Sequence, residues 1–349
     1  MNVLVTGGAG YIGSHAALRL LSEGHSVVAV DNLLRGNQAA VHILRSSAHG
    51  KNFTFIPADI ADRGTIEDAL RRHKIDAVMH FAALAYVGES VDHPLWYYRN
   101  NVVGMIALLD AVVAAGVPRF VFSSSCATYG MPPEGQIPVR EDCPQLPMSP
   151  YGWTKLHGEH ILRDVAEGCR RKQQPFAYAA LRYFNVAGAH RGGVLGEDHD
   201  PESHIIPVIL QAALGVRPHV SLFGTDYPTP DGTCVRDYVH VEDLADAHVS
   251  VMGALRPEGW DERHYNLGIG KGYSVREIID VVKRVTGRDF KVVEQPRRAG
   301  DPARLYADTS KITRELGWKA SVADLSTIVE SAWRWFEKHP QGYKGGSRQ

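Results

Sequence analysis

Cysteine is scarce in this chain, and its placement excludes a disulfide-stapled scaffold. The four cysteines are Cys126, Cys143, Cys169 and Cys234; they include no C-x-x-C pair and are spread through 349 residues. Disulfide-stapled secreted domains are short and dense in cysteine. We therefore expect reduced thiols and a cytoplasmic location.

Long apolar runs, an excess of one charge and metal-ligand spacings are also missing. No stretch reaches the ~18 apolar residues that a membrane helix needs, and the apolar opening soon gives way to glycines. The formal net charge is −1, and the 17 histidines show no H-E-x-x-H or similar spacing. We therefore expect no membrane partner, no nucleic-acid partner and no metal.

What the chain does contain is a regular alternation of apolar and amphipathic segments. The apolar runs are 2–6, 26–31, 53–58, 77–81, 119–123 and 177–183; helical patterns include 12–23, 63–72, 102–115 and 155–170. Strands alternating with helices predict βαβ units and a parallel sheet, and nearly continuous apolar runs predict strands covered on both faces. The predicted fold class is α/β: a Rossmann-like doubly wound parallel sheet with a smaller mixed α/β C-terminal substrate domain.

The regularity ends after Asn185, which predicts a second domain. Residues 188–201 and 226–232 have the composition of loops. Pattern resumes at 237–255, 264–267, 274–286 and 324–338, and Ser274 with Glu277 forms a capping box at the start of the third of these. We assign 1–185 to a nucleotide-binding Rossmann domain, to which 237–268 returns, and 186–236 with 269–349 to the substrate domain.

A glycine-rich turn follows the first predicted strand and opens the first helix. Gly7, Gly10 and Gly13 give the spacing G-x-x-G-x-x-G. Such glycines allow a tight turn, a close approach to a pyrophosphate and close packing of helix on strand, while the helix N-terminus attracts phosphate. Asp31 ends the second strand, where a carboxylate binds both ribose hydroxyls and repels a 2′-phosphate. The pattern predicts NAD rather than NADP; the alternative is a structural turn beside a surface aspartate.

A candidate catalytic group lies further along the chain. Tyr151 and Lys155 stand at i and i+4, so a helix places them on one face. A nearby ammonium, together with a positive nicotinamide, stabilises phenolate and lowers the pKa of tyrosine. Lys155 can also hold the nicotinamide ribose. Ser125 follows the fifth strand, at the sheet edge where ligands bind, and can relay the proton of a reacting hydroxyl. An exposed helical pair is the alternative for Tyr151 and Lys155 alone, but nucleotide loop, serine and Tyr/Lys in this order favour catalysis.

These motifs resemble those of the extended short-chain dehydrogenase/reductases, and within them the UDP-glucose 4-epimerase family. The similar segments are GGAGYIGSH (7–15), DNL (31–33), HFAALAYVGES (80–90), YYRNN (97–101), SSSCATYG (123–130), SPYGWTK (149–155), LRYFNVAGAH (181–190), LFGTDYPTPDGTCVRDYVHVEDLADAH (222–248), YNLG (265–268), PRRAGDPARLYAD (296–308) and WFEKHPQGY (335–343). The resemblance runs almost from end to end of the chain.

The resemblance implies a role for each matching residue. Catalysis falls to Tyr151 as base, Lys155 as its modulator and Ser125 as proton relay. NAD is contacted by Gly7, Gly10, Tyr11, Ile12, Gly13, Asp31, Asn32, Asp59, Ile60, Phe81, Asn100, Tyr151, Lys155 and Tyr183. The UDP-sugar is held by Ser125, Tyr151, Asn185, His204, Phe223, Arg236, Arg298, Asp301 and Leu305, with the two arginines on the diphosphate. A guanidinium fork suits phosphate, although alone these arginines would be read as surface charges and Phe223 as a core aromatic.

Three positions depart from the family pattern. Ala85 stands where well-studied members often carry a lysine beside a cofactor phosphate, so one phosphate contact is lost. His204 replaces an asparagine that touches the nucleotide. Leu305 stands where a large tyrosine or a small cysteine or serine gates the C2 substituent, which leaves N-acetylated sugars undecided.

The resemblance implies NAD-dependent interconversion of UDP-glucose and UDP-galactose, by hydride abstraction at C4, rotation of the 4-keto intermediate and hydride return. A 4,6-dehydratase or a decarboxylase on the same scaffold is a rival, but a dehydratase should carry an Asp-Glu pair where Cys126 and Ala127 follow Ser125. A 4-epimerase of UDP-N-acetylglucosamine, UDP-xylose, UDP-arabinose or a UDP-uronic acid stays open. A catalytically silent NAD sensor or scaffold would be expected to lack Tyr151 or Lys155. The family also implies a homodimer that packs helices around 95–115 and 150–170.

Overall fold

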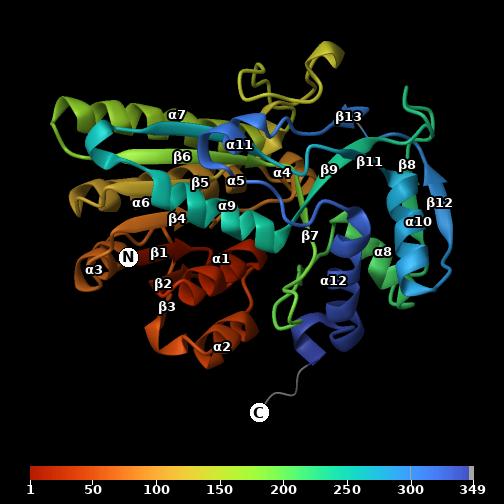
Figure 1. Cartoon of the computed structure of the whole chain (residues 1–349), viewed down its shortest axis with the longest axis horizontal. Coiled ribbons are helices and arrows are strands. Elements are labelled where there is room, and N and C mark those ends of the chain that lie inside the picture. Colours follow the sequence, from red (N-terminus) through yellow and green to blue (C-terminus); the bar gives the residue numbers. More distant parts are fainter. Residues whose placement is uncertain (299, 346–349) are drawn as a thin grey trace.

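The larger part of the molecule is built on one seven-stranded parallel sheet. The computed structural model describes residues 1–298 and 300–345 (Figure 1). The strand order is β10-β6-β5-β4-β1-β2-β3, and every neighbouring pair is parallel. The bounds are β1 Asn2–Thr6, β2 Ser26–Asp31, β3 Phe53–Pro57, β4 Ala77–His80, β5 Arg119–Ser123, β6 Ala177–Tyr183 and β10 Glu262–Leu267. This order changes direction beside β1, which creates the crevice where doubly wound sheets bind ligands.

Helices cover both faces of this sheet. Alternate strand residues divide between the two faces: Val3 and Val5 pack in one core cluster with residues of α1, α2 and α9, whereas Leu4 packs in another with residues of α3, α6 and α7. The bounds are α1 Tyr11–Ser22, α2 Gln38–Ser46, α3 Arg63–Arg72, α6 Gly104–Ala114, α7 Pro150–Arg171 and α9 Val241–Ala254. The strands are therefore buried on both faces, as their continuous apolar composition predicts.

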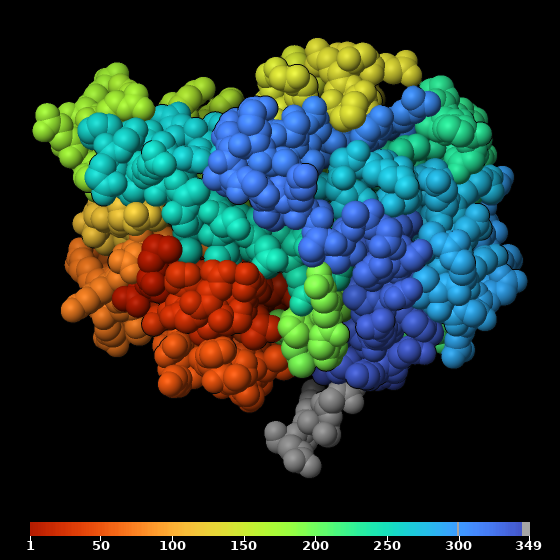
Figure 2. Space-filling model, viewed as in Figure 1, coloured from red at the N-terminus to blue at the C-terminus, as the bar shows by residue number. Residues whose placement is uncertain are grey.

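The C-terminal part has its own small sheets, helices and core. β11 Gly272–Ser274, β9 Val235–His240 and β13 Arg304–Leu305 form a mixed sheet with β7 Asn185–Ala187, and β8 Val220–Phe223 pairs with β12 Val292–Gln295. Helices α8 Ile205–Ala213, α10 Val275–Thr286 and α12 Leu325–Lys338 pack around one apolar cluster. In Figure 2 the green chain after β7 fills the space between the red N-terminal elements and the blue C-terminal helices.

Short elements complete the chain. They are α4 Val87–Asp92, α5 Pro94–Tyr97, the π-helix η2 Tyr98–Val103, α11 Ser310–Leu316 and the 3₁₀ turns η1 Gly50–Asn52, η3 Cys126–Thr128, η4 Glu134–Gln136, η5 Pro257–Gly259 and η6 Gly342–Gly345. No helix within residues 1–298 and 300–345 is long and apolar enough to cross a membrane.

Most predicted elements are confirmed; several bounds shift by one or two residues, and two helices differ for identifiable reasons. The capping box of Ser274 and Glu277 is present at the start of α10. The helix predicted over 155–170 begins earlier, because Ser149 caps it through the amide of Gly152 and Pro150 occupies its first turn. The helix predicted over 102–115 starts at Gly104, preceded by the π-helix η2. Tyr151 therefore lies in the first turn of α7.

Candidate active site

One cavity opens at the carboxyl ends of the central strands. Its walls include every residue that the sequence assigns to catalysis or to NAD; from the substrate group they include Ser125, Tyr151, Asn185 and His204. The cofactor group comprises Gly7, Gly10, Tyr11, Ile12, Gly13, Asp31, Asn32, Asp59, Ile60, Phe81, Asn100, Tyr151, Lys155 and Tyr183. Segments far apart in the sequence thus meet at the place where such sheets bind ligands.

The glycine turn leaves no room for a side chain at Gly7 or Gly13. Gly7 has φ +70°, and a Cβ there would lie 2.6 Å from the amide nitrogen of Ala82. A Cβ on Gly13 would lie 2.1 Å from the carbonyl oxygen of Gly7. Gly10 is the N-cap of α1 and provides no side-chain cap, so the first amides of the helix keep their donors available. These features fit the diphosphate of a dinucleotide.

Asp31 presents a buried carboxylate beside this turn. Its two oxygens accept from the amides of Ala9 at 3.0 Å and Leu33 at 2.8 Å. Burial raises the pKa of this carboxyl group, and the two amide donors oppose the shift. Asn32 donates to Asp59 at 2.8 Å, which joins the ends of β2 and β3. Acceptors held in this way fit ribose hydroxyls, so the residues present are compatible with NAD.

Tyr151, Lys155 and Ser125 come together on the opposite wall. The side-chain nitrogen of Lys155 donates to the carbonyl of Ser123 at 2.7 Å and lies 5.8 Å from the centre of the Tyr151 ring. Ser125 caps η3, where its hydroxyl accepts from the amide of Ala127 at 3.1 Å. The hydroxyl of Ser125, the phenol of Tyr151 and the amine of Lys155 thus line the same cavity, as proton transfer to or from a bound hydroxyl requires.

Burial governs both titratable groups of this set. It raises the pKa of the Tyr151 phenol well above its usual range, while a hydrogen bond with Ser125 opposes the shift. Burial also lowers the pKa of Lys155 to about 7. Desolvation penalises the charged form of both groups. The lowering of the phenol pKa by Lys155 together with a positive nicotinamide stays a prediction, because it involves bound NAD.

A buried ion pair holds the segment that carries Ser125. Arg182 and Glu159 are 2.6 Å apart, and their side chains are 5% and 3% exposed. Ser124 donates to the same carboxylate at 2.5 Å, and Arg182 donates to the Tyr129 hydroxyl at 2.9 Å. Strand β6, helix α7 and the end of β5 are therefore joined directly behind the catalytic candidates.

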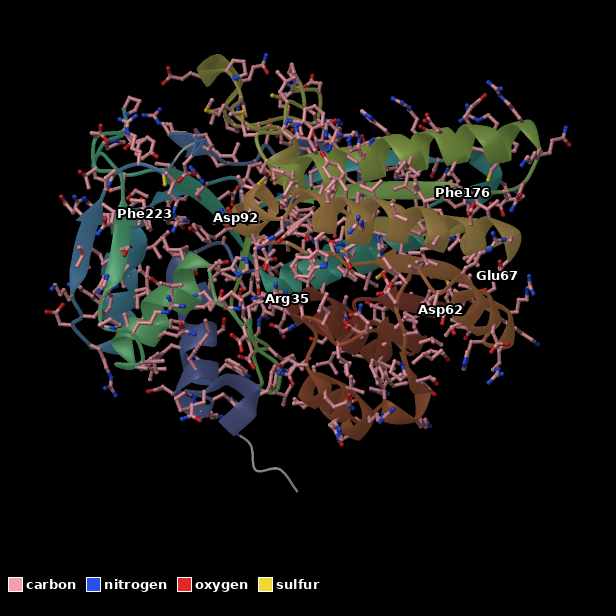
Figure 3. All side chains as sticks on the ribbon, turned by 180° about the vertical axis from the view of Figure 1, so that it is seen from behind. Arg35, Asp62, Glu67, Asp92, Phe176 and Phe223 are labelled. Atoms are coloured by element: carbon pink, nitrogen blue, oxygen red, sulfur yellow. The ribbon has the colours of Figure 1, made fainter. Side chains whose placement is uncertain are left out.

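The remaining substrate candidates form a separate group in the C-terminal part. Arg236 pairs with Asp301, and the guanidinium of Arg298 lies 3.9 Å from the centre of the Phe223 ring. Leu305 is opposite Arg236 in the parallel pair of β9 and β13. These five residues do not line the cavity described above. Figure 3 shows Phe223 on this outer part, away from Arg35 near the middle of the molecule.

The two groups are nevertheless connected by packing. Leu305 shares an apolar cluster with Phe184 and Cys126, and both of these residues line the cavity. Asn185, also in the cavity wall, donates to the carbonyl of Asp237, the neighbour of Arg236, at 3.0 Å. Packing and this hydrogen bond thus link the cavity wall to the strands that carry Leu305 and Arg236.

Sequence reasoning missed several residues of the cavity wall. Arg35 lies over the Tyr86 ring at 4.9 Å and pairs with Glu89 at 2.5 Å. Arg35, Glu197 and His199 line the cavity, and Arg35 is also held by a hydrogen bond to the carbonyl of Asp200. Position 85 offers only a methyl group, but the guanidinium of Arg35 supplies a cation on the same wall. In the sequence, these cavity residues are marked only by the polar composition of 31–36 and 197–204, which is typical of any loop and does not indicate a site.

The chain is similar to characterised sugar-nucleotide enzymes over nearly all of its length. A sequence profile described as GDP-mannose 4,6 dehydratase matches residues 4–331. The UDP-glucose 4-epimerase of Halalkalibacterium halodurans is 47% identical over 98% of both chains. UDP-arabinose 4-epimerase 1 of Arabidopsis thaliana is 46% identical, over 98% of this chain and 81% of its own.

A solved structure shows the same fold. The UDP-glucose 4-epimerase of Bifidobacterium longum, in complex with NAD⁺ and UDP, is 40% identical with a TM-score of 0.92, over 98% of this chain and 100% of its own. Similarity at this level covers both the large sheet and the C-terminal part.

Proposed function

Because this chain belongs to the extended short-chain dehydrogenase/reductases, and within them to the UDP-glucose 4-epimerase family, we propose that it interconverts UDP-glucose and UDP-galactose with NAD. The reaction is hydride abstraction at C4, rotation of the 4-keto sugar and hydride return. One observation carries this proposal: the nucleotide-binding turn and the groups Ser125, Tyr151 and Lys155 line a single cavity.

Each residue has a defined task in this reaction. NAD, when bound, supplies the acceptor and donor of the C4 hydride. Tyr151 takes the proton of the 4-hydroxyl and returns it when the hydride comes back, and Ser125, on the same cavity wall, relays it. Lys155, held on Ser123, orients the phenol and would hold the nicotinamide ribose. Arg236 and Arg298 hold the diphosphate, so UDP stays in place while the sugar turns.

This division of binding suits a reaction that inverts one carbon. Strong contacts to UDP and few contacts to the hexose allow the planar 4-keto sugar to present its other face. The catalytic serine supports epimerisation over dehydration, because Cys126 and Ala127 follow Ser125 and offer no carboxyl group to remove water. The profile described as a dehydratase therefore matches the scaffold, while the catalytic segment supports an epimerase.

The test is turnover without added cofactor. Purified protein is incubated with UDP-galactose, and the sugar nucleotides are separated and quantified after the reaction reaches equilibrium. We expect UDP-glucose to form catalytically, with no net reduction of NAD. Oxidised sugar formed in proportion to consumed NAD would indicate a dehydrogenase, and loss of water from the sugar would indicate a dehydratase.

A second substrate is favoured by the residue at the sugar end. Leu305 is buried in one apolar cluster with Tyr129 and Phe184, and its side chain is smaller than that of tyrosine. A relative of 46% identity acts on UDP-arabinose. Assays with UDP-xylose, UDP-arabinose and UDP-N-acetylglucosamine, compared between the natural chain and Leu305→Tyr, separate these ranges. If this residue limits the space at C2, the substitution lowers kcat/KM for the N-acetylated sugar far more than for UDP-glucose.

We also propose a homodimer. Exposed apolar side chains gather on adjoining short and long helices: Val91 on α4, Leu95 on α5, Val103 on η2, Ile106 on α6 and Trp153 on α7. Contacts between α5, η2 and α7 make these elements one surface. Apolar patches of this kind mark protein interfaces, and two copies would form a four-helix contact.

Two further proposals concern location and domains. The four cysteines carry no disulfide, which supports a cytoplasmic location; cell fractionation tests it.

The proposed domain division assigns 1–185 and 237–268 to NAD binding and the rest to the UDP-sugar. It is supported by the place of β10 at the edge of the large sheet and by the separate core around α8, α10 and α12. Residues 299 and 346–349 of the second unit lie outside the described part.

A further inference from the structure

Four potential metal ligands gather in the segment between β7 and α8. They are Glu197, His199, Glu202 and His204, and each offers one ligand atom such that all four atoms lie within 4.8 Å of one another. The segment is drawn in green in Figure 1 and passes beside the cavity, whose wall includes all of the four but Glu202. The sequence spacing predicts no metal site, because the four residues follow no helical or hairpin ligand pattern.

The distances between these atoms match a single small coordination shell. Nδ1 of His204 lies 3.0 Å from an oxygen of Glu197 and 3.0 Å from an oxygen of Glu202. Nδ1 of His199 lies 3.2 Å and 3.6 Å from oxygens of the same two carboxylates. Four ligands at ~2.0–2.2 Å around tetrahedral Zn²⁺ are themselves about 3.3–3.6 Å apart. The four ligand atoms, all within 4.8 Å of one another, would draw slightly together around such an ion.

One nitrogen of the cluster is directed at no partner. Nδ1 of His199 is inaccessible to solvent and makes no hydrogen bond, although two carboxylates are near it. The nitrogen lies 3.2 Å from an oxygen of Glu197 and 3.6 Å from an oxygen of Glu202, close enough to both for one cation to bind all three groups. Buried polar atoms without a partner call for such an explanation.

The charges of the cluster also fit a divalent ion. The carboxylates of Glu197 and Glu202 are 4% and 3% exposed, and two buried negative charges need compensation. A divalent ion held between the two carboxylates supplies two compensating positive charges.

We propose that Glu197, His199, Glu202 and His204 bind one divalent transition-metal ion of the zinc class. Two imidazoles and two carboxylates suit zinc, whereas Mg²⁺ and Ca²⁺ prefer oxygen ligands alone. All four positions are filled by protein, so the ion is structural and takes no part in the hydride or proton transfer.

The ion would order the segment that closes the cavity beside Tyr11 and Tyr86. The ring of His199 contacts both tyrosines edge-on, at 6.1 Å and 5.9 Å between ring centres. Coordination through Nδ1 also fixes the proton of His204 on Nε2, which makes that nitrogen a hydrogen-bond donor at the cavity wall. The proposal does not rest on the proposed reaction, because metal content is measured without turnover.

The test measures metal binding to the full-length protein. After treatment with a chelator and its removal, the protein is titrated calorimetrically with Zn²⁺ and separately with Mg²⁺, and bound zinc is counted by mass spectrometry. We expect one equivalent of zinc with micromolar or tighter affinity, no Mg²⁺ binding, and a higher melting temperature with zinc. Co²⁺ in place of zinc should give the strong visible absorption of a tetrahedral site.

Two substitutions assign the ion to this cluster. His199→Ala and Glu202→Gln should each weaken zinc binding by more than ~100-fold, while His42→Ala, at an exposed histidine of α2, should leave it unchanged. Circular dichroism verifies that each variant is folded. If a variant does not fold, the Co²⁺ spectrum of the natural chain decides the question, because only the cluster provides two imidazoles and two carboxylates at these distances among the described residues. Failure to bind one equivalent of zinc, an octahedral Co²⁺ spectrum, or equal binding by the folded variants would overturn the proposal.

Discussion

Lys155 donates a hydrogen bond of 2.7 Å to the main-chain carbonyl of Ser123, the last residue of β5. The contact fixes the first turns of α7 against the end of the sheet. Tyr151 and Ser125, one on each side of this contact, are thereby kept within reach of one another. The contact between the end of β5 and the start of α7 thus sets the relative positions of Ser125, Tyr151 and Lys155.

The buried amine makes stability depend on pH. Burial lowers the pKa of Lys155 from 10.5 to about 7, so between these values the unfolded chain binds a proton that the folded chain does not. The contribution of this group is complete above pH 10.5 and is lost as the pH falls through 7. For cofactor-free protein, the natural chain should gain stability relative to Lys155→Met between pH 7 and 10, by up to about 1.4 kcal/mol per pH unit.

Urea unfolding at several pH values measures this difference. Lys172→Met, at an exposed lysine after the same helix, is the control and should show no such trend. A stability difference that is independent of pH would mean that Lys155 is charged in the folded protein.

Replacing the phenol tests the proposed base. Tyr151→Phe removes one hydroxyl from a buried site and should lower kcat by about 10²–10⁴. The amount of NAD bound should change little, because the glycine turn and Asp31 are untouched. The comparison is Tyr178→Phe, whose hydroxyl lies 3.4 Å from Glu262 at the other end of β6. Full activity of Tyr151→Phe would remove this residue from the mechanism.

The carboxylate at the end of β2 should decide which dinucleotide binds. Asp31→Asn removes the negative charge, which weakens NAD by roughly 10- to 100-fold, as expected for a hydrogen bond to a charged group. It also removes the repulsion of a 2′-phosphate, so the preference for NAD over NADP should shrink. Both affinities are measured by calorimetry on apoprotein. Asp68→Asn, in an exposed pair on α3, should bind both dinucleotides as the natural chain does.

The ion pair behind the site should be costly to break from one side. Arg182→Met leaves Glu159 buried without its cation and should destabilise the protein by about 3–5 kcal/mol. Replacing both residues, in Glu159→Leu with Arg182→Met, should restore part of this loss, since no charge is then left unpaired. Denaturant unfolding of the natural chain, of Arg182→Met and Glu159→Leu alone, and of the double variant gives the comparison. A double variant whose loss equals the sum of the two single losses would show that the residues are not coupled.

A charge on the exposed helical surface should separate the proposed dimer. Leu95 is 67% exposed on α5, and in a symmetric interface Leu95→Glu places two like charges in an apolar contact. Light scattering after size exclusion should show the mass of a dimer for the natural chain and of a monomer for the variant. Val216→Glu, on the C-terminal part, should leave the mass unchanged. A monomeric natural chain would contradict the proposal directly.

Features that depend on neighbouring residues could be read from the sequence. The bounds of β1, β2, β5 and β6 agree with the apolar runs, because strands buried on both faces leave a continuous signal. The glycine turn could be recognised because each glycine answers a local steric demand. The Ser149–Pro150 start of α7 was also readable as a cap followed by proline at the first position, although the helix was predicted to begin later.

Features that depend on tertiary burial could not be read in this way. The pKa of Tyr151 is set by desolvation, which no spacing reports. The cluster of Glu197 and His204 forms only when an irregular loop folds back on itself, so its four members share no period. Arg35 reaches the cavity from a loop whose path is decided by contacts with Glu89 and Asp200.

The pairing of β9 with β13 sets Leu305 opposite Arg236. On the proposed roles, one backbone ladder carries both the residue that limits the sugar and the residue that holds the nucleotide. Evolution can then exchange the side chain at 305, and with it the range of accepted sugars, while the main-chain bonds keep Arg236 in place. Single substitutions at this position would therefore change the accepted sugar while the binding of UDP by Arg236 is kept.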